Sequence, residues 1–142
     1  MKALVVDDDS INRLILQKIL SVYAEVHSCV DGKEAVEKYK TALDRGEPYD
    51  LVCMDVRMPV MGGIETLRII RREDDCSRLR PQATKVIMTT AADDHDTVDL
   101  AFRELCDAYI VKPIDAERLI DVVRCLFPIE KLSVLPEAPH AV

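Results

Sequence analysis

The sequence lacks three features that would assign it to a common functional class. No run approaches 18 apolar residues, and the first residues lead into a strand-like run and acids without the apolar segment of a signal peptide, which predicts neither a membrane span nor secretion. Lys and Arg number 19 against 26 Asp and Glu, so the net charge of -7 argues against a nucleic-acid-binding surface. The five cysteines have no metal-ligand spacing, and we interpret them as packing residues of a reduced, cytoplasmic protein.

The sequence does contain a fivefold alternation of strand-like and helix-like patterns. Short β-branched runs indicate buried parallel strands, whereas apolar residues three or four apart indicate helices. The predicted strands are 3–6, 24–29, 51–54, 86–89 and 109–111, and the predicted helices are 11–22, 33–43, 64–72, 94–105 and 115–126. The apolar stripe of the first helix is Ile11, Leu14, Ile15, Ile19 and Val22. Repeated βα units imply right-handed crossovers and a three-layer α/β/α sandwich.

The length of 142 residues suits one domain. We place this domain at residues 1–127. Residues 73–83 are polar and are predicted to form a surface loop, and residues 128–142 are predicted to form a flexible C-terminal tail.

Charged residues follow three of the predicted strands at the point where each strand ends. The acids Asp7, Asp8 and Asp9 follow the first strand, Asp55 ends the third, and Lys112 follows the fifth. Because the carboxyl ends of parallel strands meet at one edge of the sheet, where open α/β folds bind ligands, these groups are expected to share a crevice. Several carboxylates and one ammonium in one crevice predict a chemical site.

Four sequence blocks resemble the signatures of a known family. They are Leu4-Val5-Val6-Asp7-Asp8, Met54-Asp55-Val56-Arg57-Met58-Pro59, Met88-Thr89-Thr90-Ala91 and Tyr109-Ile110-Val111-Lys112-Pro113. In order and spacing they are similar to the blocks of receiver domains of two-component response regulators, over residues 1–127. The resemblance implies a flavodoxin-like fold with a five-stranded parallel sheet in the order 2-1-3-4-5.

By this resemblance, Asp55 accepts a phosphoryl group with the help of Mg²⁺. A carboxylate attacks an anionic phosphoryl group only when a cation screens the repulsion, and hard oxygen ligands suit Mg²⁺. The implied metal ligands are Asp7, Asp8, Asp55 and the backbone carbonyl of Arg57.

The resemblance also assigns contacts to the transferred phosphoryl group. Lys112 and the Thr90 hydroxyl are expected to bind phosphoryl oxygens, as are the backbone amides of Arg57 and Ala91. The Lys112-Pro113 peptide is expected to be cis, a form that is inexpensive only before proline. Thr90 and Tyr109 are expected to act together as the conformational switch.

The implied protein is a single-domain response regulator of the cytoplasm. It accepts its phosphoryl group from a sensor histidine kinase or a histidine phosphotransfer protein, catalyses its own phosphorylation and slow autodephosphorylation, and is otherwise a switch rather than an enzyme. Phosphorylation alters the surface formed by the fourth predicted helix (94–105), the fifth strand (109–111) and the fifth helix (115–126). This helix 4–strand 5–helix 5 surface controls an unknown downstream protein or forms a homodimer. In this family the dephosphorylation rate depends partly on the residues here occupied by Arg57 and Ala92. No output domain follows the receiver, although the chain could also be a piece of a longer hybrid kinase.

Alternative interpretations assign other roles to the same residues. In a phosphohydrolase of the haloacid-dehalogenase kind, Asp7 would be the nucleophile and Asp9 the general acid, but the block around Asp55 would be unexplained; Asp9 is better interpreted as a helix cap. A receiver-like scaffold would bind partners without phosphorylation, but it usually lacks one of the acids or the lysine. A flavin-binding protein would need a glycine- and hydroxyl-rich loop after the first strand, where this chain has acids.

Overall fold

The computed structural model describes residues 1–76, 82–94, 96, 99–100 and 106–132. The elements in chain order are β1 (Lys2–Val6), α1 (Ser10–Leu20), β2 (Glu25–Cys29), α2 (Gly32–Asp44), β3 (Leu51–Asp55), α3 (Gly63–Cys76), β4 (Lys85–Thr90), β5 (Ala108–Val111), α5 (Ala116–Leu126) and the 3₁₀ helix η1 (Ile129–Leu132). The helix predicted at 94–105 lies largely outside the described residues.

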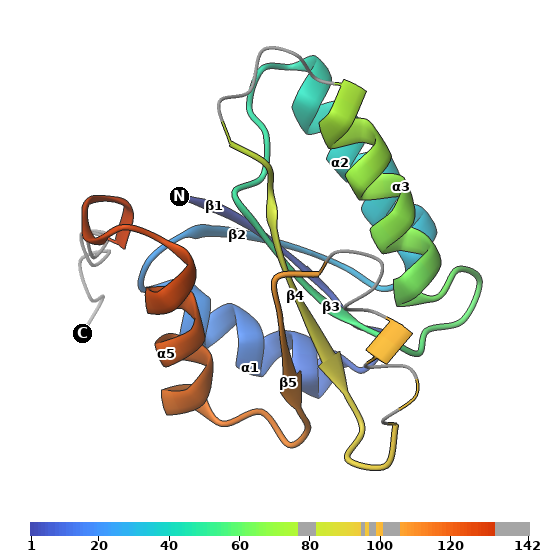
Figure 1. Ribbon diagram of the computed structural model, residues 1–142, viewed down its shortest axis with the longest axis vertical. Helices are drawn as coiled ribbons and strands as arrows, with labels where there is room; N and C mark the ends of the chain where they lie inside the picture. The colour runs from blue at the N-terminus through green and yellow to red at the C-terminus, as the bar shows by residue number, and fades with distance from the viewer. Residues whose placement is uncertain (77–81, 95, 97–98, 101–105, 133–142) are drawn as a thin grey trace, which may run out of the picture.

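The five strands form one parallel sheet in the order β2-β1-β3-β4-β5, which confirms the predicted topology. Helices α2 and α3 cover one face of the sheet, and α1 and α5 cover the other (Figure 1). The central strands β1 and β3 are buried on both faces, as their continuous apolar runs predict. Their side chains alternate between two core clusters, one with α2 and α3 and the other with α1 and α5.

Helix α1 begins where predicted, but its buried face differs from the predicted stripe. The carboxylate of Asp9 accepts a hydrogen bond from the backbone N–H of Ile11 at 2.8 Å, so Asp9 is the N-cap. Leu16 and Leu20 are the buried residues of this helix. Of the predicted stripe only Ile19 packs against the core, because the sequence contains two apolar faces and the sheet covers only one. The uncovered residues are Ile11, Leu14, Ile15 and Val22, which are 67%, 53%, 37% and 44% exposed.

Helix α3 is longer than predicted, because it continues to Cys76 where we expected the loop of 73–83 to begin. The polar residue Asp74 is retained in the helix, with a side chain only 4% exposed that pairs with Arg71 one turn earlier. A buried carboxylate needs such a partner. The last turn of α3 therefore depends on polar contacts, which a pattern of apolar residues in the sequence does not show.

The first residues of the expected tail are ordered. Ile129–Leu132 form η1, in which Lys131 Nζ lies 2.8 Å from Asp50 Oδ1 and Leu132 packs against the α1/α5 core cluster. Residues 133–142 lie outside the described part of the chain.

Two of the five cysteines do not fit the packing interpretation. Cys76 and Cys125 are exposed, whereas Cys29, Cys53 and Cys106 are buried. Burial raises the pKa of the Cys29 and Cys53 thiols to about 12, which keeps them protonated and unreactive. Within the described residues, no helix combines the length and the hydropathy that a membrane crossing requires.

Candidate functional site

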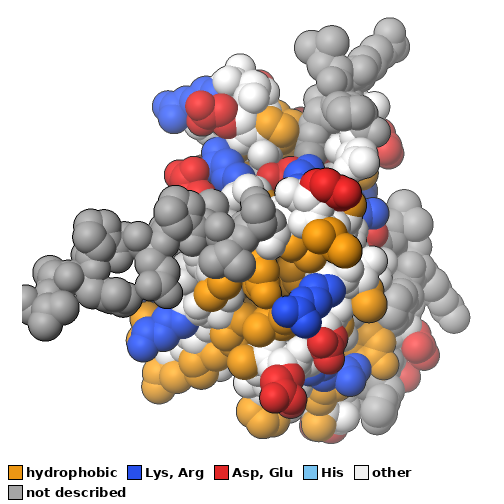
Figure 2. Space-filling model, turned by 90° about the vertical axis from the view of Figure 1, so that its left-hand side faces the viewer, with side chains coloured by type: hydrophobic (Ala, Val, Ile, Leu, Met, Phe, Trp, Pro, Cys, Tyr) orange, Lys and Arg blue, Asp and Glu red, His pale blue; other side chains and the backbone are white. Residues whose placement is uncertain are grey.

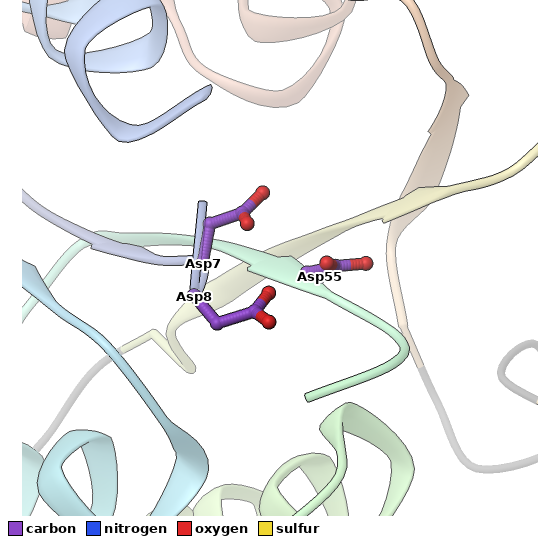
Figure 3. Close-up of side chains that lie close together, drawn as sticks. All are labelled: Asp7, Asp8 and Asp55. Atoms are coloured by element: carbon purple, nitrogen blue, oxygen red, sulfur yellow. The ribbon is translucent and has the colours of Figure 1, made fainter. Parts of the chain in front are cut away.

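Three carboxylates gather at the carboxyl edge of the sheet. Asp7 and Asp8 follow β1, and Asp55 ends β3, the strand paired with β1. Carboxylate oxygens of the three residues lie within 4.8 Å of one another (Figure 3). Asp7 is fully buried and Asp55 is 7% exposed, whereas Asp8 is exposed. The parallel topology therefore brings together acids that are far apart in the sequence.

Lys112 reaches this cluster from the loop after β5. Its Nζ donates a hydrogen bond to Asp55 Oδ2 at 3.0 Å and lies 3.2 Å from Asp7 Oδ2. Its backbone N–H donates to the Thr90 carbonyl at 2.7 Å, which fixes the loop beside β4. The Lys112-Pro113 peptide bond is cis. One ammonium thus faces three carboxylates, and the cluster carries a surplus of negative charge.

The carboxylates of this cluster are only partly satisfied by protein donors. Asp7 Oδ1 accepts the backbone N–H of Asp9 at 2.9 Å, and Asp55 Oδ1 accepts that of Arg57 at 3.3 Å. Asp7 Oδ2 is buried and accepts no hydrogen bond from the described residues, although it forms an ion pair with the ammonium of Lys112 at 3.2 Å. Because the ammonium of Lys112 is shared with Asp55, it compensates the two carboxylates only in part, and the cluster can take a further cation.

Burial and charge act on the ionisation of the site in opposite directions. Burial raises the pKa of Asp55 despite the hydrogen bond from Lys112, and the negative charge of Asp7 adds to the increase. Burial works to lower the pKa of Lys112, but the hydrogen bond and charge of Asp55 and the charge of Asp7 outweigh it and raise this pKa. The lysine therefore stays charged beside the acids.

The residues present fit a small divalent cation. The cluster offers only oxygen donors, and the ammonium beside its buried Asp7 oxygen is shared with Asp55. Asp8 is exposed, which leaves room for the waters that Mg²⁺ retains. Asp7, Asp8 and Asp55 are the residues that would hold the ion.

The other expected site residues lie around the ends of β4 and β5. Thr90 ends β4 and is 1% exposed, and its hydroxyl donates to the Ala91 carbonyl at 3.3 Å rather than to Asp55. Ala91 is exposed in the following loop. Tyr109 in β5 is half-buried against the core cluster under α2 and α3.

Sequence reasoning missed three residues near the site. Thr89 pairs in register with Asp55, and its buried hydroxyl has no hydrogen-bond partner within the described residues. Asp94 is buried, and its Oδ2 lies 2.9 Å from Arg57 Nε. Gly63 begins α3 so close to β3 that a Cβ there would overlap the Asp55 carbonyl oxygen. The sequence carried a signal only for Gly63, through the Gly62-Gly63 pair.

Comparison with known proteins identifies the class to which this fold and site belong. The family model described as "Response regulator receiver domain" matches residues 3–124. The chain belongs to this family, whose members are signalling switches of two-component systems. Receiver domains are phosphorylated by histidine kinases and act on downstream targets.

Particular relatives are of two kinds. The chain is 32% identical over 124 residues to the chemotaxis protein CheY of Bacillus subtilis, covering 86% of this chain and 93% of that protein. It is 31% identical over 132 residues to the hybrid signal transduction histidine kinase G of Dictyostelium discoideum, covering 91% of this chain but 4% of the kinase. The chain thus spans nearly the whole of one relative and a small part of the other.

Solved structures share the fold. CheY in the CheX–CheY–BeF3–Mg²⁺ complex of Borrelia burgdorferi superposes with a TM-score of 0.77 at 28% identity, covering 90% of each chain. Vibrio cholerae CheY4 gives a TM-score of 0.74 at 26% identity, covering 89% of this chain and 98% of that one.

Proposed function

We propose that Asp55 is the phosphoryl acceptor of a Mg²⁺-dependent signalling switch. The observation that carries the proposal is the cluster of Asp7, Asp8 and Asp55 around one ammonium, Lys112, with a buried Asp7 oxygen left without a hydrogen bond. Such a cluster is costly for stability alone and suits a site that gains a cation and a phosphoryl group. The haloacid-dehalogenase alternative is disfavoured because Asp9, its general acid, is occupied as the N-cap of α1.

The reaction is the transfer of a phosphoryl group from the phosphohistidine of a partner protein, or from a small phosphodonor, to a carboxylate oxygen of Asp55. The bond from Asp55 oxygen to phosphorus forms as the bond from the donor to phosphorus breaks. With phosphohistidine the broken bond is nitrogen–phosphorus and the imidazole keeps the electron pair; with acetyl phosphate it is oxygen–phosphorus and acetate leaves with the electron pair. Lys112 neutralises charge on the transferred group. The backbone N–H of Arg57 already points at the acceptor carboxylate, and that of Ala91 is proposed to approach from the loop after β4. Asp7, Asp8, Asp55 and the Arg57 carbonyl would hold Mg²⁺, which would screen the repulsion between the carboxylate and the phosphoryl oxygens.

The switch is proposed to begin at Thr90 and Lys112. The Thr90 hydroxyl bonds only weakly to the Ala91 carbonyl, at 3.3 Å, so a phosphoryl oxygen competes for it with little cost. Movement of Thr90 leaves space that Tyr109 can enter from the neighbouring strand. The helix 4–strand 5–helix 5 surface then changes and controls a downstream protein or forms a homodimer. We place this switch in the cytoplasm.

A protein phosphodonor is proposed to dock on α1. Ile11, Leu14 and Ile15 are exposed on one face of α1, in the half of the helix that begins next to the site. Figure 2 views the side of the molecule on which α1 and α5 lie and shows hydrophobic side chains gathered there. Exposed apolar residues at this spacing suit a partner that lays a helix across them, which would bring a phosphohistidine to Asp55.

The acceptor assignment is tested by intact mass after incubation with acetyl phosphate, with Mg²⁺ or with a chelator. We expect a gain of about 80 Da, one phosphoryl group, in wild type with Mg²⁺ only. Asp55→Asn is expected to show no gain, and Asp9→Asn, in which the helix cap is conserved, is expected to be labelled like wild type. Labelling of Asp55→Asn but not of Asp7→Asn would favour the hydrolase chemistry instead. No labelling of folded wild type by acetyl phosphate or by any histidine kinase would favour the scaffold.

The docking surface is tested by comparing two donors. Leu14→Arg is expected to slow labelling by a phosphohistidine-bearing phosphotransfer domain that labels wild type, and to leave labelling by acetyl phosphate unchanged. Ile129→Arg is the matched control, because Ile129 is 87% exposed but lies in η1. Equal slowing by both variants would contradict docking on α1.

A further inference from the structure

The Arg57 side chain pairs with Asp94 and joins two loops near the acceptor. Its Nε lies 2.9 Å from Asp94 Oδ2, and this ion pair joins the loop after β3 to the loop after β4. The Asp94 side chain is 6% exposed, whereas that of Arg57 is 78% exposed. The backbone N–H of Asp94 also donates to the Ala91 carbonyl at 3.2 Å, so Asp94 has more contacts with the protein than the exposed guanidinium shows.

The position of this pair makes it sensitive to the state of Asp55. The backbone N–H of Arg57 lies 3.3 Å from Asp55 Oδ1, so the long Arg57 side chain starts next to the acceptor. A phosphoryl group on Asp55 would add a doubly charged anion within reach of this side chain. Guanidinium binds phosphoryl oxygens in a bidentate manner, at least as well as it binds a carboxylate.

We propose that Asp94 is a positioning residue that holds Arg57 away from the acceptor, and that a phosphoryl group on Asp55 competes with Asp94 for the Arg57 guanidinium. The transfer of Arg57 from Asp94 to the phosphoryl group releases the loop after β4, which begins at Ala91 next to the last residue of β4, Thr90. The pair thus opposes the phosphorylated state and shortens its lifetime. This inference rests on the proposed function.

Beryllofluoride, which mimics a phosphoryl group on a carboxylate, provides a probe that needs no turnover. With Mg²⁺ present, Asp94→Asn is expected to bind it at least about fivefold more tightly than wild type, because Arg57 no longer has to leave a carboxylate. Asp93→Asn is the matched control: it removes the same charge from an exposed position in the same loop and leaves the pair intact. It is expected to bind like wild type.

The double variant separates positioning from a structural defect. In the Arg57→Ala background, Asp94→Asn is expected to leave both beryllofluoride affinity and aspartyl-phosphate lifetime unchanged, since the group that it positions is gone. A structural role for Asp94 would weaken binding in both backgrounds. In NMR spectra, the Nε–H resonance of Arg57 can be assigned as the one that is absent from Arg57→Lys. This resonance should shift when beryllofluoride is added to wild type.

The outcomes distinguish this inference from the proposed function. Wild type that neither binds beryllofluoride nor gains a phosphoryl group would overturn the proposed function. If wild type is labelled at Asp55, either of two results would overturn the competition alone. One is that Asp94→Asn binds beryllofluoride no more tightly than Asp93→Asn does. The other is that Asp94→Asn gives the same gain in beryllofluoride affinity in the Arg57→Ala background.

Discussion

The two ends of the sheet both bury charged groups, but they satisfy them differently. At the amino edge, Arg71 of α3 bonds Asp107 at 2.7 Å, and the same Asp107 oxygen accepts the backbone N–H of Val86 at 2.7 Å. Thr84 donates to the Tyr49 carbonyl at 2.7 Å and also bonds the Tyr39 hydroxyl. At the carboxyl edge, three carboxylates share one lysine, and Asp7 Oδ2 accepts no hydrogen bond from the described residues.

This difference separates a structural polar network at the amino edge from the network at the carboxyl edge, which is proposed to be reactive. A fully satisfied network fixes α2, α3 and the strands in one arrangement, and removing a member leaves buried groups unpaired. A deficient network costs stability and gains from added ligands. The comparison predicts opposite responses to mutation at the two edges.

The largest effect on stability is expected at the amino edge. Arg71→Ala removes the cation shared by Asp74, whose side chain is 4% exposed, and the partly buried Asp107, to which only the longer pair with Lys85 at 3.9 Å remains among the described residues. The change should lower the free energy of unfolding by about 3–5 kcal/mol. The exposed neighbour Arg72→Ala should change it by less than about 0.5 kcal/mol. Denaturant unfolding measures both. Labelling of folded Arg71→Ala by acetyl phosphate should persist, and a stable Arg71→Ala protein would remove the contrast between the edges.

At the carboxyl edge, Asp7→Asn should act in the opposite sense on stability. Relief of the repulsion among the carboxylates is expected to raise the free energy of unfolding by about 1 kcal/mol in the absence of metal. The same variant should lose the stabilisation that Mg²⁺ gives to wild type. Thermal unfolding with and without Mg²⁺ tests both statements. A destabilised Asp7→Asn protein would mean that this edge is as well satisfied as the other.

A smaller gain is expected in the loop beside Asp55. Val60 has a positive φ of 71°, a conformation that is strained for a β-branched residue, and its side chain is 78% exposed. Val60→Asn should raise the free energy of unfolding by about 1 kcal/mol or less. Val22→Asn, at another exposed valine, controls for the change in polarity. Equal effects of the two variants would show that Val60 stores no strain.

The smallest effect is expected for the ion pair that anchors η1 to the amino edge. Burial acts to raise the pKa of Asp50, but hydrogen bonds from Lys131 and from the Lys2 backbone N–H outweigh it and hold this pKa below its ordinary value. A carboxyl group with a lowered folded pKa stabilises the protein above its unfolded pKa, and this contribution is lost as the pH falls below about 4. Lys131→Met should therefore lower stability at pH 7 and flatten the loss below pH 4. Lys40→Met, in a more exposed pair, is the control, and unchanged pH curves for Lys131→Met would contradict this reading.

The strands, their order in the sheet and the residues at their carboxyl ends could be predicted from the sequence, because they follow from apolar patterns and from the topology of repeated βα units. Residues at the carboxyl ends of parallel strands lie at one edge of the sheet, so the sequence alone is enough to place Asp7, Asp55 and Lys112 together. The face of α1 that is buried could not be predicted, because Leu16 and Ile11 lie on two apolar sides of the same helix and only the sheet chooses between them.

Contacts between loops were also beyond the sequence. Arg57 and Asp94 are 37 residues apart and lie in loops that have no periodic pattern of apolar residues. Nothing in the sequence near either residue predicts that the two form a pair. The end of α3 depends in the same way on Asp74, whose partners come from α2, from α3 and from Thr84 just before β4.

The central claim is that the deficient edge exists to form an acyl phosphate on Asp55, and chemical trapping tests it directly. Borohydride reduces an aspartyl phosphate to homoserine but leaves a free carboxylate unchanged. After incubation of wild type with acetyl phosphate and Mg²⁺, peptide mapping is expected to show homoserine at position 55 and aspartate at positions 7, 8 and 9. Homoserine at position 7, or no homoserine in a protein that gains the phosphoryl mass, would contradict the account.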